Sequence, residues 1–177
     1  MVTAEKTTSR GAEIGTEAAA LAEVEALFRY LLSPQRLYPG AALAVYHAGS
    51  LVLDLAGGYA DTQRGDPVRA DTLFSLFSGT KPFASIALLQ QIERGKAALD
   101  DPVARYWPAF GQQGKQEVLL SHILSHRGGF PTTPPELTPE RWGDWEAAIK
   151  AIEAMPLEAA PGAVSAYHHL TQQWVCA

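Results

Sequence analysis

Hydrophobic residues in the first third of this chain follow a helical spacing and then a strand-like one. Over residues 17–32 they recur at i, i+3 and i+4, which predicts an amphipathic helix that ends before Pro34. Two short apolar runs, 41–47 and 51–55, flank the turn-forming residues 48–50. This arrangement predicts a β-hairpin.

Downstream of the hairpin the pattern is mostly helical. Pro82 suits a first helical turn, and the apolar run after it predicts a helix from Ser78 to near Gly95. The same spacing predicts two further helices, and polar or proline-rich segments predict three loops. The helices are 115–126 and 142–155, and the loops are 61–71, 132–139 and 156–162. The order of helix, hairpin and further helices indicates an α+β fold, although two strands alone make a poor sheet.

Composition is typical of a globular chain that can build a core. The chain has 177 residues, of which 47% are hydrophobic and 19% charged. Its net charge of −5 argues against general nucleic-acid binding, and its apolar runs are too short for a membrane span. The single cysteine, Cys176, has no partner for an internal disulfide. Residues 1–16 lack the apolar centre of a secretory signal, so we expect a flexible leader there and a cytoplasmic location.

Ser78 and Lys81 are the first candidates for chemistry. Their spacing of three positions places both side chains on one face of a helix. A desolvated lysine can lose its proton and act as a base, and a serine beside such a base becomes a nucleophile. The helix N-terminus would also favour negative charge at this point. The alternative is structural, because serine is an ordinary N-cap residue.

Other candidate residues are less specific. Tyr167 could act as a general base if nearby cations lowered its pKa from about 10, or it could be an aromatic core residue. His122 and His126 stand four positions apart but lack the glutamate and third ligand of a zinc site, so we expect no metal. We expect His126 to end a helix and to bind backbone carbonyls. Residues 111–115 resemble a phosphate loop only superficially, since Gln116 replaces the serine or threonine, and we expect no cofactor.

Taken together, these residues resemble the serine β-lactamase-like superfamily, most closely the family VIII carboxylesterases that are related to class C β-lactamases. The matching segments occur in the family's order, and they are residues 57–61, 71–74, 77–81, 99–108, 123–131 and 161–168. They include the Ser-x-x-Lys motif and a His-x-x-Gly-x-Pro turn. The resemblance implies a β-lactamase/transpeptidase-like fold. Residues 17–177 would form an incomplete domain: the N-terminal helix, the hairpin and most of the helical region, without the C-terminal strands.

The resemblance also implies a mechanism through an acyl-enzyme. Ser78 would attack an acyl carbonyl, Lys81 would take the serine proton, and Tyr167 would relay a proton to the leaving group. The Ser78 backbone N–H would supply one oxyanion donor. Many relatives have Tyr-x-Asn at the tyrosine, whereas this chain has His168 and His169 after it, which favours ester over β-lactam hydrolysis. Either histidine could contact the substrate, which we expect to be a small-molecule ester or amide.

Two other interpretations stay open. The absence of the family's C-terminal strands suggests a non-catalytic remnant or binding scaffold, and the motifs are also compatible with a β-lactamase or penicillin-binding peptidase. A sheet that lacks strands exposes an unpaired edge, so we also expect self-association through that edge.

Overall fold

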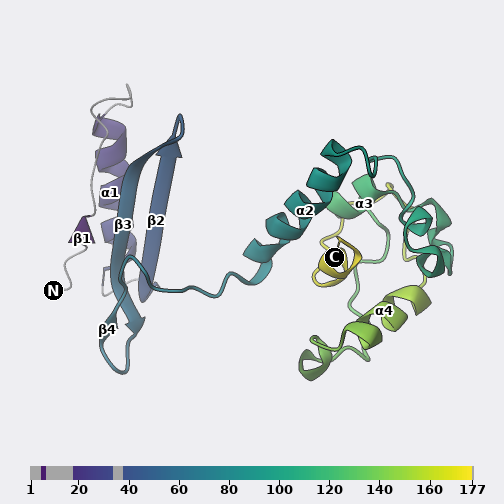
Figure 1. Ribbon diagram of the computed structural model, residues 1–177. Helices are drawn as coiled ribbons and strands as arrows, with labels where there is room; N and C mark the ends of the chain where they lie inside the picture. The colour runs from purple at the N-terminus through teal and green to yellow at the C-terminus, as the bar shows by residue number, and fades with distance from the viewer. Residues whose placement is uncertain (1–4, 7–17, 34–37, 177) are drawn as a thin grey trace. The chain divides into compact units, whose positions relative to one another are not determined.

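The computed structural model describes residues 5–6, 18–33 and 38–176, which belong to two compact units, Met1–Ser75 and Leu76–Ala177 (Figure 1). Within the expected leader, Glu5–Lys6 forms the short strand β1, and the rest of residues 1–16 lies outside the described residues. The single domain expected over residues 17–177 stays a prediction, because each unit is described by itself.

The predicted hairpin forms the centre of the first unit. Strands β2 (Gly40–His47) and β3 (Ser50–Asp61) pair antiparallel, and Ala48 and Gly49 connect them. Both turn residues have positive φ, 47° and 78°, which gives a two-residue turn whose twist matches that of the strands. The strand β3 is longer than predicted because glycines allow the pairing to continue. A Cβ on Gly58 would lie 2.2 Å from the Pro39 carbonyl oxygen.

A helix covers this sheet. Helix α1 (Ala18–Leu31) confirms the helix predicted over residues 17–32, and Phe28 on it packs against Leu53 and Leu55 of β3. Strand β3 also pairs with β1 and with β4 (Asp66–Pro67). The prediction of a loop over 61–71 was therefore wrong at Asp66–Pro67, which joins the sheet. Among the described residues, β2 pairs with β3 only, so its other edge carries no strand.

The second unit is helical. Its longest helix, α2 (Lys81–Glu93), confirms the predicted helix that ends near Gly95, where φ is +69°. Helix α4 (Trp145–Ala154) begins later than predicted because the Asp144 side chain accepts the Ala147 backbone N–H and caps it. The short helix α5 (Thr171–Cys176) was not predicted. None of the helices in the described ranges combines the length and apolarity that a membrane crossing needs.

The helix predicted over 115–126 was wrong. The structure has a 3₁₀ turn at Lys115–Glu117, and helix α3 covers only Leu120–Leu124. Val118 and Leu119 between them are extended, because Leu119 forms an isolated β-bridge with Pro102. Apolar residues on both sides of this break still enter the same core, which explains why the hydrophobic spacing resembles that of one helix.

Lys115 lies in that core and is fully buried. Its ammonium donates to the carbonyl oxygens of Glu153, at 3.0 Å, and Met155, at the C-terminal end of α4. Burial lowers the pKa of Lys115, and the charge of Glu153 opposes that shift. The lysine of the phosphate-loop-like segment thus caps a helix, since the last carbonyls of a helix have no partner within it.

Candidate active site

A strained turn presents Ser78 at the start of α2. Residues Phe77–Thr80 form a 3₁₀ turn that leads into the helix, with Pro82 in its first turn as predicted. Phe77, directly before the serine, has a φ of +45°, which is unusual for a bulky residue. The Thr80 hydroxyl donates to the Phe77 carbonyl oxygen at 2.7 Å and holds the turn. The sequence therefore places an exposed serine on a fixed, strained backbone.

Lys81 lies next to that serine and is buried. Its Nζ atom is 3.3 Å from Ser78 Oγ and donates to the carbonyl oxygen of His169 at 2.6 Å. Only 6% of Lys81 is exposed, whereas Ser78 is open to solvent. The amine is thus held at the serine hydroxyl by a second segment of the chain.

Tyr167 completes this group. Lys81 Nζ lies 5.0 Å from the centre of its ring. Hydrogen bonding to Ser78 and then to Lys81, with a smaller effect of the lysine charge, lowers the pKa of the Tyr167 hydroxyl, and desolvation opposes that shift. A phenol whose pKa is lowered, beside a serine and a lysine, is suited to accept and return protons. The structure brings together all three residues that the sequence selected as catalytic.

The two histidines after the tyrosine have different surroundings. The His168 side chain is buried, with 1% exposed, and its ring stands edge-on to Phe130 at 5.0 Å between centres. Burial lowers its pKa. This burial contradicts the expectation that His168 contacts substrate. His169 is exposed, and its backbone carbonyl, which sequence reasoning missed, binds Lys81.

The remaining histidines hold backbone groups. His122 Nδ1 accepts the Leu119 N–H at 3.2 Å, and His126 Nδ1 accepts the His168 N–H at 3.1 Å. The expectation that the His126 ring binds carbonyls was therefore wrong, because its nitrogen is an acceptor. His126 also lies beyond the end of α3, so the two rings do not share a helix face. The described residues contain no group of three side chains placed to hold a metal ion.

Helix α5 also holds the start of α2, a contact that sequence reasoning missed. The Gln173 side chain donates to the Thr80 hydroxyl at 2.7 Å, and Gln172 donates to Ser85 at 3.3 Å. The six residues of α5 are too few to show a helical period, so only the glutamine pair could have signalled a contact.

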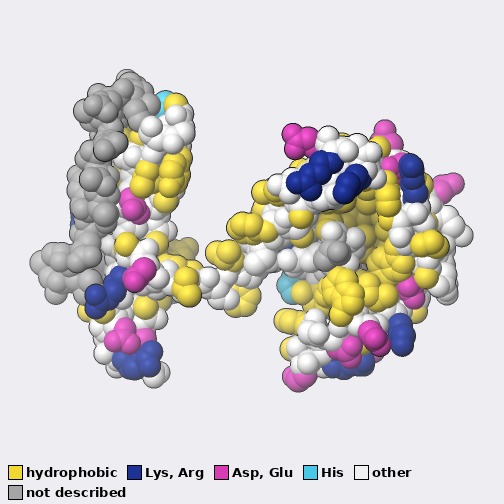
Figure 2. Space-filling view, in the orientation of Figure 1, with side chains coloured by type: hydrophobic (Ala, Val, Ile, Leu, Met, Phe, Trp, Pro, Cys, Tyr) yellow, Lys and Arg dark blue, Asp and Glu magenta, His cyan; other side chains and the backbone are white. Residues whose placement is uncertain are grey.

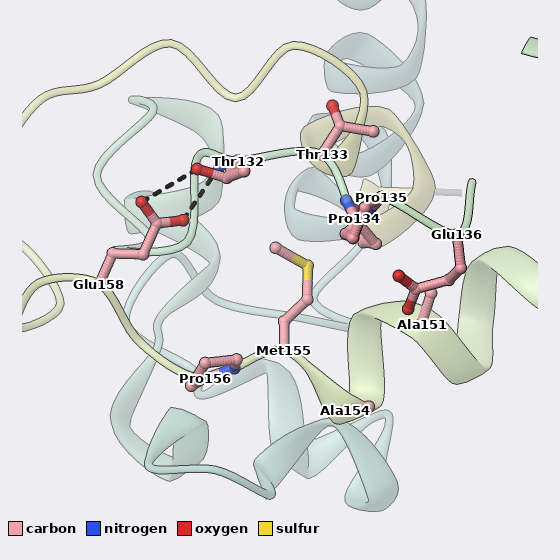
Figure 3. Close-up of a pocket in the computed structure, with 10 residues that line it drawn as sticks. All are labelled: Thr132, Thr133, Pro134, Pro135, Glu136, Ala151, Ala154, Met155, Pro156 and Glu158. Atoms are coloured by element: carbon pink, nitrogen blue, oxygen red, sulfur yellow. Dashed lines mark hydrogen bonds between the residues drawn. The ribbon is translucent and has the colours of Figure 1, made fainter. Parts of the chain in front are cut away.

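Two surface features lie within this unit. Exposed hydrophobic side chains, among them Phe77 and Phe83, gather along the start of α2 (Figure 2). A separate pocket of about 370 Å³ lies between residues 132–136 and the end of α4 (Figure 3). Glu158 at its rim accepts hydrogen bonds from the backbone and hydroxyl of Thr132. Ser78, Lys81 and Tyr167 do not line this pocket, so it is distinct from the group that those three residues form.

A serine at a helix start, with a buried lysine and a tyrosine of lowered pKa at its hydroxyl, is the arrangement of a serine acyl-transfer site. The chain belongs to the Beta-lactamase family, whose model matches residues 18–175. It is 38% identical to Esterase EstB of Burkholderia gladioli over 64% of this chain and 30% of that protein. It is 33% identical to Esterase/beta-lactamase LipL of Mycobacterium tuberculosis over 80% of this chain and 33% of that protein. The chain thus spans about a third of the length of these curated relatives.

Solved structures confirm the β-lactamase-like fold. A family VIII carboxylesterase matches with a TM-score of 0.83 and 26% identity, over 97% of this chain and 44% of that one. A penicillin-binding protein homologue from Caulobacter crescentus matches with the same TM-score of 0.83 and 32% identity, over the same shares of 97% and 44%. The chain therefore holds part of that fold, as the sequence predicted.

Proposed function

We propose that this chain carries the nucleophile half of a serine carboxylesterase that acts on short-chain esters through an acyl-enzyme. The observation that carries the proposal is the contact of Lys81 Nζ with Ser78 Oγ at 3.3 Å, beside a tyrosine whose pKa is lowered. Apolar side chains exposed beside Ser78 are suited to an uncharged acyl group. The esterase relatives support this choice of substrate class.

The residues divide the reaction between them. As Ser78 Oγ bonds to the ester carbonyl carbon, its proton passes to the Lys81 amine. The tetrahedral intermediate collapses, the bond to the alcohol oxygen breaks, and Tyr167 relays the proton from Lys81 to the leaving alcohol. Water then attacks the acyl carbon and gives one proton to the same residues. The bond between that carbon and Ser78 Oγ breaks, the carboxylic acid leaves, and the proton returns to Oγ. The Ser78 backbone N–H supplies one donor to the oxyanion.

The test measures how this 177-residue chain reacts with a serine-directed probe and whether it hydrolyses an ester. A fluorophosphonate probe should modify the peptide that contains Ser78, and p-nitrophenyl butyrate should release p-nitrophenol. Ser78→Ala should abolish both, whereas Ser75→Ala, an exposed serine three positions upstream, should keep both. Turnover that survives Ser78→Ala would overturn the assignment. A wild-type chain that neither reacts with the probe nor turns over would favour the non-catalytic scaffold instead.

A second candidate is action on β-lactams or peptidoglycan peptides. A Beta-lactamase of Escherichia coli is 34% identical over 59% of this chain, and Penicillin-binding protein 4* of Bacillus subtilis is 31% identical over 56% of it. Hydrolysis of nitrocefin faster than that of p-nitrophenyl butyrate, or stable labelling by a fluorescent penicillin, would favour this candidate. The cytoplasmic location expected from the sequence stays a prediction.

We also propose that the chain associates through the outer edge of β2. Among the described residues that edge pairs with no other strand, and an exposed edge offers backbone donors and acceptors to a second copy. Light scattering should show a dimer or larger species. Ala44→Pro, which disrupts an edge strand, should reduce that species to a monomer.

A further inference from the structure

Tyr167 lies in a segment that forms neither helix nor strand, so contacts from elsewhere must fix its position. One residue supplies two of them. The backbone carbonyl of His126 accepts the N–H of Ala166 at 3.0 Å, and its ring Nδ1 accepts the N–H of His168 at 3.1 Å. The residues directly before and after the tyrosine are therefore both held by a single residue 42 positions upstream of His168.

The ring of His126 also packs on the tyrosine itself. The two ring centres are 4.7 Å apart at an interplanar angle of 44°. The Lys81 Nζ atom also lies near the tyrosine, 5.0 Å from the centre of its ring. The imidazole and the Lys81 amine are thus both close to the Tyr167 ring.

The backbone at His126 explains how one residue can make all these contacts. Its φ is +57°, a left-handed conformation directly after α3. Its own N–H donates to Ile123 at 3.2 Å, and the next N–H, of Arg127, donates to His122 at 2.7 Å. Hydrogen bonds to carbonyls of α3 therefore hold this turn in place. In this conformation the carbonyl and the ring of His126 both reach the segment that contains Tyr167. Among non-glycine residues, histidine and asparagine adopt this conformation more readily than most.

We propose that His126 is the positioning residue for Tyr167: its carbonyl and its ring Nδ1 hold the backbone on both sides of the tyrosine, and this sets the phenol against Ser78 and Lys81. The proposal rests on the proposed function, because it assigns the tyrosine a role in proton transfer. His126 itself does not touch the reacting atoms. A misplacement of about 1 Å at a reacting group can cost about 10²-fold in rate, so a residue of this kind has a measurable effect.

The hydrogen bond that His126 accepts from the His168 N–H requires an unprotonated Nδ1. The titratable groups that face His126 are His168, Lys81 and Tyr167. Burial first, and then the charges of His168 and Lys81, lower the pKa of His126. The ring therefore stays neutral, with its proton on Nε2 and its lone pair on Nδ1, at the pH where ester hydrolysis would run. Protonation at Nδ1 would replace the acceptor with a donor and release the His168 N–H.

Two variants separate the hydrogen bond to the His126 ring from the packing of that ring on Tyr167. His126→Asn keeps an acceptor atom on Cγ and tolerates the left-handed backbone, whereas His126→Phe keeps an aromatic ring but has no acceptor. His122→Phe is the matched control, because His122 also accepts a backbone N–H through Nδ1 but serves the start of α3. The first measurement is the titration of the Tyr167 hydroxyl by NMR of ¹³C-labelled tyrosine, assigned with Tyr167→Phe. The second is the rate of Ser78 labelling by the fluorophosphonate probe as a function of pH.

We expect His126→Phe to raise the pKa of Tyr167 toward about 10 and to slow labelling by about 10–10²-fold, with His126→Asn close to wild type in both. His122→Phe should change neither. A Tyr167 titration that is unchanged in His126→Phe would overturn the proposal. If wild type does not label but its Tyr167 titration responds to His126→Phe, the proposed function fails and the positioning role stands.

A measurement on the wild-type protein keeps the test independent of variant folding. The N–H···N contact between His168 and His126 should give a ¹⁵N–¹⁵N coupling across the hydrogen bond at pH 8. That coupling should disappear as the imidazole is protonated. Its absence at pH 8 would overturn the proposal.

Discussion

The Lys81 amine donates to the backbone carbonyl of His169 at 2.6 Å, across 88 positions of sequence. This bond is shorter than the 3.3 Å contact of the same amine with Ser78 Oγ. A backbone carbonyl is fixed by the course of the chain, so it directs the lysine toward the serine whatever side chain residue 169 carries. The Lys81 amine is therefore positioned jointly by α2 and by the segment that leads into α5.

Replacement of Lys81 should stop acylation while leaving the serine in place. Lys81→Met removes the proton acceptor and should slow probe labelling of Ser78 by about 10²–10⁴-fold, the usual contribution of a general base. Lys81→Arg should be equally slow, because a guanidinium does not give up its proton. Lys150→Met, on the exposed side of α4, is the control and should label at the wild-type rate. Labelling of Lys81→Met within threefold of wild type would exclude the lysine as the base.

Lys115 should contribute to stability and not to chemistry. Lys115→Met fills a similar volume but leaves the carbonyls of Glu153 and Met155 without their donor. We expect the free energy of unfolding in urea to fall by about 1–3 kcal/mol, the cost of unsatisfied buried polar groups. The same Lys150→Met variant should stay within about 0.5 kcal/mol of wild type. An unchanged urea midpoint for Lys115→Met would contradict the capping role.

The protein should lose stability as the pH falls through the histidine range. Burial lowers the pKa of both His126 and His168 in the folded state, whereas the unfolded chain titrates near about 6.5. Below that pH the unfolded state binds protons that the folded state does not, so the free energy of unfolding decreases with decreasing pH. Urea unfolding at pH 8, 6.5 and 5 should show this fall. His168→Phe should make it shallower, and a flat profile in wild type would contradict the two shifts.

The thiol of Cys176 should react slowly in the folded protein. Burial raises its pKa from 9.0 to about 11, a difference of 2 pH units. Near pH 8 the thiolate fraction is then about 100-fold lower than in the unfolded chain, and reaction with a disulfide reagent should slow by about that factor. Full reactivity in 6 M urea is the control. Equal rates with and without urea would mean that α5 does not bury the thiol.

Local signals were sufficient for much of the fold and of the site. The spacing of apolar residues predicted α1, the hairpin and the helix after Ser78, since each is set by its own sequence. The three-residue spacing of Ser78 and Lys81 was enough to predict that their side chains lie side by side. The pairing with Tyr167 followed from the family resemblance, because nothing local to that tyrosine indicates its partners.

The errors arose where distant segments decide the structure. Residues 115–126 have helical spacing, but the bridge between Leu119 and Pro102 imposes an extended break. The His169 contribution is a backbone carbonyl, which every residue has, so no residue type could signal it. His168 was expected as a possible substrate contact, but its ring packs on Phe130, which lies 38 positions away in sequence and which no local pattern links to it.

The bond between Lys81 and His169 also sets an order of events during synthesis. A ribosome that adds about 5–20 residues per second needs about 4–18 s to make the 88 residues between them. Throughout that interval Ser78 has already been translated, but its lysine has no carbonyl to hold it. The contacts that hold Lys81 between Ser78 Oγ and the His169 carbonyl can therefore form only after translation has passed residue 169.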